Sequence, residues 1–227
     1  MKLLNLPLQI LSVAILLSLC NSSFSYQSCI NYPKLQQAAS NLLSKLEASD
    51  QREREKPNLT KNDWLTMNKN DLKRRIQVSE LFAEGCFKSA ADYYNAAMIF
   101  QHGDAPDQYY QAFIWAKRSA ELGNFAGKHM SFLAVDRYLV SVGKKQLFGS
   151  QYYAKKINTC FCMQPVEKSF SDKLRKEYAG ATLKEHYDLM ASINQKNCPQ
   201  IECDIKLSSL SDDAIASWAA LVRFRDK

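Results

Sequence analysis

A histidine and an aspartate on either side of a glycine are the first residues whose types and spacing could do chemistry. His102 and Asp104 follow an expected helix over residues 90–101, and the negative end of a helix dipole favours an imidazolium there. Asp104 could orient the ring, so that His102 acts as a general base. The alternative, which we favour, is a helix-ending turn in which Asp104 begins the next helix.

A second polar pair, Asp136 and Arg137, is expected inside a helix among apolar residues. Side chains that are neighbours in sequence point about 100° apart on a helix, so one of the two faces inward and needs a partner. Arg74 or Arg75 could pair with Asp136, and we favour such a buried structural ion pair over catalysis. A hydrolase or transferase would instead need all the candidate polar side chains in one cleft. Those side chains are His102, Asp104, Asp136, Arg137 and Gln151.

The segment after this helix offers hydrogen-bonding groups without charge. Gln146, Ser150 and Gln151 supply donors and acceptors, and Gly149 permits a left-handed or closely approached backbone. Neutral amides are poor acids and bases, so we expect this loop to position rather than to react. Gln146 and Gln151 either bind a ligand or brace two helices, and we favour bracing.

Aromatic residues in the middle of the chain supply a candidate surface for a partner. They are Tyr93, Tyr94, Tyr109, Tyr110 and Trp115. On a concave surface of helical hairpins they would hold a protein or peptide, whereas in a core they would pack against one another. The sequence therefore predicts a protein- or peptide-interaction module of the bacterial cell envelope. A small hydrolase or transferase that uses His102 is the alternative function.

Helices along almost the whole chain must position these residues. Apolar residues recur at three-and-four spacing, and Ser or Thr caps followed three positions later by an acidic residue mark several helix starts. The expected helices span residues 34–47, 70–82, 90–101, 107–122, 125–142, 183–193 and 212–224. No segment of adequate length alternates with a period of two. The expected fold class is therefore all-α, a set of antiparallel helical hairpins.

The first two expected helices are joined by a charged stretch. Residues 48–62 contain Pro57 and are expected to form an exposed linker. In the second helix we expect one buried stripe, made of Leu72, Ile76, Val78, Leu81 and Phe82. Further along, Ala112, Ala116 and Ala120 recur every fourth residue, a small-residue seam that lets a neighbouring helix approach closely.

Two segments in the middle of the chain are Ala91-Asp-Tyr-Tyr-Asn-Ala-Ala and Trp115-Ala-Lys-Arg-Ser-Ala-Glu-Leu-Gly123. Together they resemble one unit of a Sel-type repeat, the short-loop relative of tetratricopeptide repeats. It covers about one repeat, and the chain shows no second copy at a fixed period. The resemblance implies a tetratricopeptide-like helical hairpin in this region.

A broader resemblance rests on motifs between residues 71 and 193. They are Asp71-Leu-Lys-Arg-Arg75, His102-Gly-Asp104, Val135-Asp-Arg-Tyr-Leu-Val140, Gly143-Lys-Lys-Gln-Leu-Phe-Gly-Ser-Gln151 and Pro165-Val-Glu167, followed by Asp172, Arg175 and Tyr187. In this order they are similar to an uncharacterised bacterial family, which has Thr, Tyr and Thr where this chain has Val135, Phe148 and Ser150. The family is a domain of unknown function, so the resemblance implies a fold and candidate residues rather than a reaction.

The first 25 residues are expected to be a cleaved secretory signal. An apolar run over residues 8–19 follows Lys2 and is too short to span a bilayer, and Ser23 and Ser25 suit cleavage after residue 25. An uncleaved N-terminal anchor and lipidation at Cys20 are the alternatives, which we rank below release. Residues 26–227 are then a single helical domain, periplasmic or secreted, with no membrane span after cleavage.

Six cysteines remain after cleavage, and an even number in an exported chain indicates disulfides. They are Cys29, Cys86, Cys160, Cys162, Cys198 and Cys203. The pairs at 160/162 and 198/203 flank the helix pair expected over residues 169–193, so we expect bridges between the pairs, which leaves Cys29 to meet Cys86. The four C-terminal cysteines could instead bind zinc, although the one-residue gap in the first pair is tighter than the usual zinc spacing.

Composition and charge exclude several classes of protein. Of the 227 residues, 46% are hydrophobic and 23% are charged, which is typical of a packed domain and excludes a wholly disordered chain. The formal charge of +7 is dispersed, and this favours attraction to anionic envelope surfaces over recognition of nucleic acid. The chain has no His-Glu-x-x-His motif and no phosphate-binding glycine loop, so we expect no metal and no cofactor.

Overall fold

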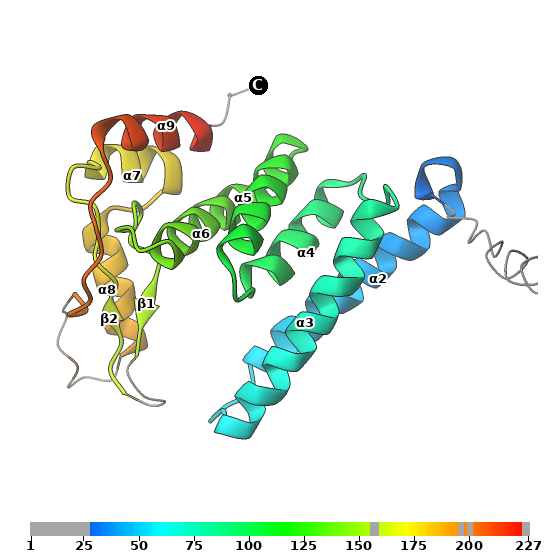
Figure 1. Cartoon of the computed structure of the whole chain (residues 1–227), viewed down its shortest axis with the longest axis horizontal. Coiled ribbons are helices and arrows are strands. Elements are labelled where there is room, and N and C mark those ends of the chain that lie inside the picture. Colours follow the sequence, from blue (N-terminus) through cyan, green and yellow to red (C-terminus); the bar gives the residue numbers. More distant parts are fainter. Residues whose placement is uncertain (1–27, 155–158, 195–197, 199–201, 224–227) are drawn as a thin grey trace, which may run out of the picture.

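The computed structural model describes residues 28–154, 159–194, 198 and 202–223, and helices dominate them (Figure 1). The expected all-α fold class is confirmed, with a small two-stranded sheet in addition. None of the described helices is long and apolar enough to cross a membrane. The signal sequence expected over residues 1–25, including Cys20, lies outside the described residues.

The N-terminal part is a hairpin of two long helices, α2 (Pro33–Arg54) and α3 (Lys61–Ala83). The Thr60 hydroxyl accepts a hydrogen bond from the Asp63 N–H, and the Asp63 carboxylate accepts one from the Thr60 N–H, so a capping box begins α3. The exposed linker expected over residues 48–62 is wrong up to Arg54 and again from Lys61, where α3 begins. The helix α2 continues to that residue because Asp50 lies on its buried side, among ion-pair partners.

The side of α3 that packs against the rest of the protein is not the side that the apolar spacing predicts. Val78 is buried as expected, but Leu72 and Ile76 are 52% and 50% exposed. The inward side carries Met67, Asp71, Arg74, Arg75 and Val78. Ion pairs between α2 and α3 hold the charged side chains inward, and these long-range contacts override the apolar spacing.

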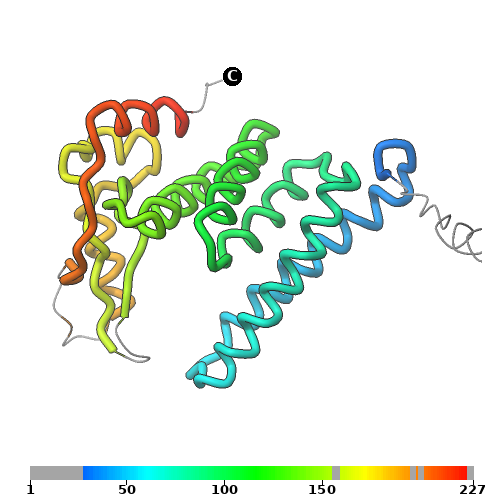
Figure 2. The backbone as a smooth tube through the Cα atoms, in the orientation of Figure 1, coloured from blue at the N-terminus to red at the C-terminus, as the bar shows by residue number. Residues whose placement is uncertain are grey.

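Three consecutive helices, α4 (Ala90–Gln101), α5 (Pro106–Glu121) and α6 (Phe125–Ser141), form the middle of the protein. The helix α5 packs against both α4 and α6, and α4 also contacts α2 (Figure 2). The small-residue seam on α5 permits the expected close approach. Ala112 and Ala116 are fully buried, and a Cβ on Gly127 of α6 would lie only 2.7 Å from the Ala116 carbonyl oxygen.

The C-terminal part combines two short strands with three helices. They are β1 (Tyr152–Tyr153), β2 (Cys162–Met163), α7 (Asp172–Ala179), α8 (Leu183–Ile193) and α9 (Asp212–Val222). The strands are antiparallel, with Tyr152 opposite Met163. The helix α9 returns to the middle helices, where the Trp218 ring lies 5.7 Å from the rings of Phe113 and Tyr138. This contact joins the C-terminal part to the main core.

Three disulfides confirm the expected pairing. They are Cys29–Cys86, Cys160–Cys198 and Cys162–Cys203. The two C-terminal bridges use all four sulfurs that the zinc alternative requires, so these cysteines offer no thiolate to a metal. Disulfides form in oxidising compartments, which fits an extracellular or periplasmic protein.

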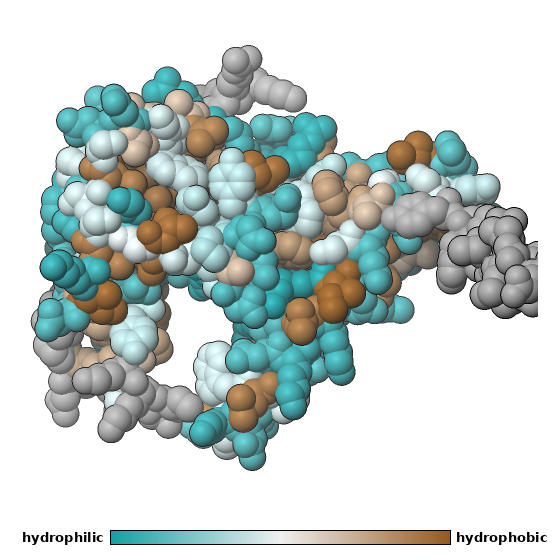
Figure 3. Space-filling model, viewed as in Figure 1, coloured by the Kyte–Doolittle hydropathy of each residue, from teal (hydrophilic) through white to brown (hydrophobic). Residues whose placement is uncertain are grey.

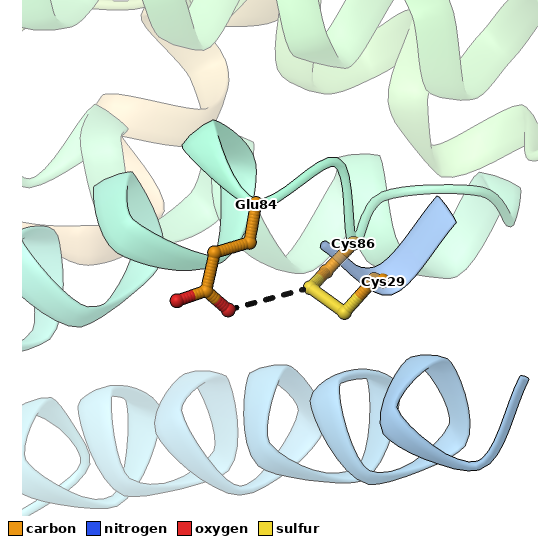
Figure 4. Close-up of side chains that lie close together, drawn as sticks. All are labelled: Cys29, Glu84 and Cys86. Atoms are coloured by element: carbon orange, nitrogen blue, oxygen red, sulfur yellow. Dashed lines mark hydrogen bonds between the residues drawn. A yellow bond between two sulfur atoms is a disulfide. The ribbon is translucent and has the colours of Figure 1, made fainter. Parts of the chain in front are cut away.

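The N-terminal bridge holds the short 3-10 turn η1 (Cys29–Asn31) against the end of α3. Figure 4 shows Glu84 beside this bridge, with its carboxylate 3.9 Å from the Cys86 sulfur. Among the described residues, Cys29, Glu84 and Cys86 are the one group of metal-ligand types that gathers closely enough to hold an ion. Because the two sulfurs are bonded to each other, the group is a covalent tie rather than a metal site.

Candidate functional site

The carboxylate of Asp136 contacts the 146–151 loop rather than His102, Asp104 or Arg137. The carboxylate is fully buried and accepts hydrogen bonds of 2.8 to 2.9 Å from the N–H groups of Leu147, Phe148 and Ser150 and from the Ser150 hydroxyl. Burial raises the pKa of Asp136, and these hydrogen bonds oppose the rise. The expected ion pair with an arginine of residues 74–75 is wrong, because backbone N–H groups take the place of the guanidinium. Asp136 therefore holds the 146–151 loop on α6.

The amide of Gln146 braces the same loop. Gln146 is fully buried, and its Nε2 donates to the carbonyl oxygens of Gln151 and Gln164 at 3.0 and 2.7 Å. Its Oε1 accepts a 2.8 Å hydrogen bond from the Gln151 N–H. A ligand cannot reach an amide that is enclosed and fully engaged in this way. The bracing role favoured for Gln146 thus agrees with its contacts, and its proposed role in binding does not.

His102 is held by a different aspartate from the one expected. Its Nδ1 lies 2.8 Å from Oδ2 of Asp50, which is fully buried on α2. The Asp104 side chain is 77% exposed and lies 3.3 Å from Arg75 instead. The expected orientation of His102 by Asp104 is therefore wrong. A carboxylate accepts a hydrogen bond, so Nδ1 carries the ring proton, and Nε2 has no hydrogen-bond partner among the described residues.

The surroundings of His102 and Asp50 favour a neutral imidazole and an ionised carboxylate. Burial lowers the pKa of His102, and the hydrogen bond that its Nδ1–H donates to Asp50 only partly opposes this. Burial alone would raise the pKa of Asp50, but the hydrogen bond to His102 and the charges of Arg54 and Arg74 lower it. The side chain of His102 keeps 18% of its surface exposed. The open Nε2 of a neutral ring has no proton to donate, but it can accept a proton or a hydrogen bond.

A network of ion pairs between α2 and α3 supports Asp50. Arg54 lies 2.8 Å from both Asp50 and Asp71, and Arg74 lies 2.6 Å from Asp71. Arg74 also lies 2.9 Å from Glu53, so the charges alternate along the hairpin. Removal of one member would leave a buried charge without its partner, which is costly. The network therefore fixes the position of Asp50, and through it that of His102.

Arg137 lies beside His102, and its guanidinium makes its hydrogen bonds and ring contact with neutral groups, within reach of the positive charge of Arg54. Its Nε donates to Gln151 Oε1 at 3.0 Å, another guanidinium N–H donates to the Gln101 carbonyl, and the guanidinium lies 5.9 Å from the centre of the Tyr109 ring. No carboxylate among the described residues pairs with it. Burial lowers its pKa, yet the side chain remains partly exposed. We call His102, Tyr109, Arg137 and Gln151 the Arg137 site.

Local structure explains how the chain builds this site. His102 ends α4, and the Tyr109 hydroxyl on the first turn of α5 donates to the Gly103 carbonyl at 2.7 Å. Arg75 donates to the His102 carbonyl at 3.2 Å, so the turn is held from both sides. In the view of Figure 3 an open notch separates the C-terminal part from the far end of the α2–α3 hairpin, and in Figure 1 the α4–α5 turn points toward it.

The predicted aromatic surface is largely core. Trp115 is 3% exposed and contacts the rings of Phe87 and Phe100, so its expected role in binding is wrong. Tyr93 and Tyr94 are half-buried against the same core. Tyr110 is 41% exposed, and its ring lies 5.6 Å from that of Tyr138. Tyr109 belongs to the Arg137 site.

Sequence reasoning missed Asp50. It was hidden in the stretch assigned to a linker, although a signal was present. Ala39, Leu43, Leu46 and Asp50 follow three-and-four spacing, and the first two are buried on the side where Asp50 is also buried. A charged residue at the next position of an apolar stripe indicates a buried partner.

Comparison of the chain with protein-family models, with curated proteins and with solved structures finds no match. The resemblances to a Sel-type repeat and to the bacterial family of unknown function therefore stay expectations.

Proposed function

We propose that this protein is an interaction module that binds acidic peptide segments at the Arg137 site. The observation that carries the proposal is the guanidinium of Arg137, which is mostly enclosed and faces an amide oxygen, a carbonyl oxygen and an aromatic ring, but no carboxylate among the described residues. Enclosed arginines are normally paired with an anion. A ligand carboxylate would supply that charge and could accept two parallel hydrogen bonds.

The groups around Arg137 fit the same ligand. The open Nε2 of His102 can accept a hydrogen bond from a peptide N–H, and Gln151 Oε1 already orients the guanidinium. Tyr110 follows Tyr109 on α5, packs on Tyr138, which follows Arg137 on α6, and is 41% exposed; tyrosine is enriched at interaction sites. The dispersed positive charge of the chain would speed the approach of an acidic partner.

The proposed setting is the bacterial envelope or the outside of the cell. The signal expected over residues 1–25 and the three disulfides support export. Determination of the N-terminal residue of the protein recovered from the cells that make it would test this. A chain that still begins at Met1 in the cytoplasm would contradict it.

Isothermal titration with an oligoglutamate peptide tests the binding proposal, with an oligoglutamine peptide of equal length as the uncharged control. We expect binding of the acidic peptide only, weakened roughly 10- to 100-fold by Arg137→Gln, because a charged hydrogen-bond pair contributes about 1.5–3 kcal/mol. Arg52→Gln, a change at an exposed arginine of α2, is the matched control and should bind as the parent does. Equal affinity of Arg137→Gln and the parent would refute the proposal.

A hydrolase is the second candidate function, and one observation favours it. The 2.8 Å hydrogen bond between Asp50 and His102 leaves Nε2 open, which is the arrangement of a general base. Asp136 cannot take part, because its oxygens hold the 146–151 loop. Hydrolysis of a panel of ester and peptide substrates, lost in His102→Gln while the fold is retained, would support this function. Turnover unchanged in that variant would exclude His102 as the base.

A further inference from the structure

The outer side of α3 carries apolar residues and its inner side carries charged ones, which is the reverse of the usual arrangement in a surface helix. The helix directs Asp71, Arg74 and Arg75 inward, whereas Leu65, Leu72 and Ile76 point outward and are 51%, 52% and 50% exposed. At 100° per residue these three side chains fall within about 40° of one another, so they form one straight stripe about 17 Å long. We call Leu65, Leu72 and Ile76 the α3 stripe. Figure 3 shows apolar side chains in this region surrounded by hydrophilic surface.

Basic residues border the α3 stripe. Lys61, Lys69 and Lys73 are exposed on the same side of the helix. The acidic residues of α3 lie elsewhere or are occupied: Asp63 pairs with Lys56, Asp71 is buried, and Glu80 lies one turn beyond the stripe. The surface that a partner meets is therefore apolar at its centre and positive along its edges.

Charge decides which partner fits this surface. A second copy of the chain, packed stripe against stripe, would bring Lys69 and Lys73 near their counterparts, because both lie close to the middle of the stripe, and like charges at an interface oppose association. An anionic membrane has no such conflict. The apolar side chains enter the headgroup region, and lysine stems lie along them with their ammonium groups on lipid phosphates.

Two further features favour a membrane partner. Trp64 is 43% exposed and lies about 100° around α3 from the stripe, which is the headgroup level when the stripe faces the lipid, and aromatic side chains are enriched at that level. The whole chain carries a formal charge of +7, which attracts it to anionic lipid over several ångströms before contact. We propose that the α3 stripe docks this protein on a membrane surface rich in anionic lipid, independently of the Arg137 site.

Sedimentation with lipid vesicles tests the proposal. Vesicles of phosphatidylglycerol and phosphatidylethanolamine in equal parts should bind the full chain, and vesicles of phosphatidylcholine alone should bind it far less. Leu72→Ser with Ile76→Ser should weaken binding at least about tenfold, because apolar surface no longer leaves water. Leu189→Ser is the matched control, since Leu189 is also 52% exposed but lies on α8. All variants contain the same residues 1–27, so a difference in vesicle binding between them arises from α3.

A second pair of variants separates charge from apolar contact. Lys69→Gln with Lys73→Gln should weaken binding to the anionic vesicles and remove most of its sensitivity to salt, whereas Lys173→Gln on α7 should not. These surface changes should leave the melting temperature unaltered. Equal binding of the α3 variants and the parent would overturn the proposal. A dimer seen by light scattering would also overturn the proposal if the Leu72→Ser and Ile76→Ser changes converted it to a monomer, because a second copy of the chain would then cover the stripe.

Discussion

The carboxylate of Asp136 allows the sharpest test of the local structure. Oδ1 accepts from the N–H groups of Leu147 and Phe148, and Oδ2 accepts from the N–H and hydroxyl of Ser150. In Asp136→Asn the remaining oxygen can keep the first two bonds, while the new NH2 group faces the Ser150 N–H. In Asp136→Ala all three backbone N–H groups lose their acceptor within a fully buried site.

The two variants should therefore form a graded series. Each buried N–H left without an acceptor costs about 1–3 kcal/mol, so Asp136→Asn should lose about 2 kcal/mol of unfolding free energy and Asp136→Ala about 5 kcal/mol. Asp204→Asn, at an exposed position, is the control and should change stability by less than about 0.5 kcal/mol. Urea unfolding followed by circular dichroism measures all three values. Equal losses for Asn and Ala, or losses below about 1 kcal/mol, would refute this role of Asp136.

Three further predictions concern stability. Cys29→Ser with Cys86→Ser opens a loop with a sequence separation of 57, so unfolding in urea should show a loss of about 4 kcal/mol, and an unchanged midpoint would contradict the bridge. Burial lowers the pKa of His186, so on acidification the unfolded chain takes up the proton before the folded one, and stability should fall as the pH drops below about 6.5. Thermal melts across this pH range should show a smaller fall in melting temperature for His186→Gln than for the parent. Gln146→Ala should lower the melting temperature, because three buried backbone groups lose a partner; a melt like that of the parent would exclude bracing.

Local signals in the sequence predict the helices well where caps are present. Ser89 with Asp92 and Thr182 with Glu185 begin α4 and α8 as expected, because each capping box depends on residues within one turn. The disulfide pairing is also predictable, because the two C-terminal cysteine pairs flank one stretch of helix. The strands β1 and β2 are not, since two residues each are too few to show alternation.

The candidate site was only partly predictable, because its key contacts join distant residues. The structure brings Arg137 close to His102, as the hydrolase alternative requires, but the aspartate that orients His102 is 52 residues away on α2. The sequence pattern also assigns Leu72 to the core, whereas the pairing of Arg74 with Asp71 and with α2 turns Leu72 outward. Buried ion pairs of this kind are set by the tertiary arrangement, which apolar spacing does not report.

Nuclear magnetic resonance of the Arg137 side chain tests the central claim most directly. The Nε–Hε signal of Arg137 should be resolved, because that group is held by Gln151 at 3.0 Å. On titration with the oligoglutamate peptide we predict that this signal and the ring signals of His102 shift together and saturate at the affinity found by calorimetry. If both stay unchanged while the peptide binds, the ligand lies elsewhere and the Arg137 site is not the binding site.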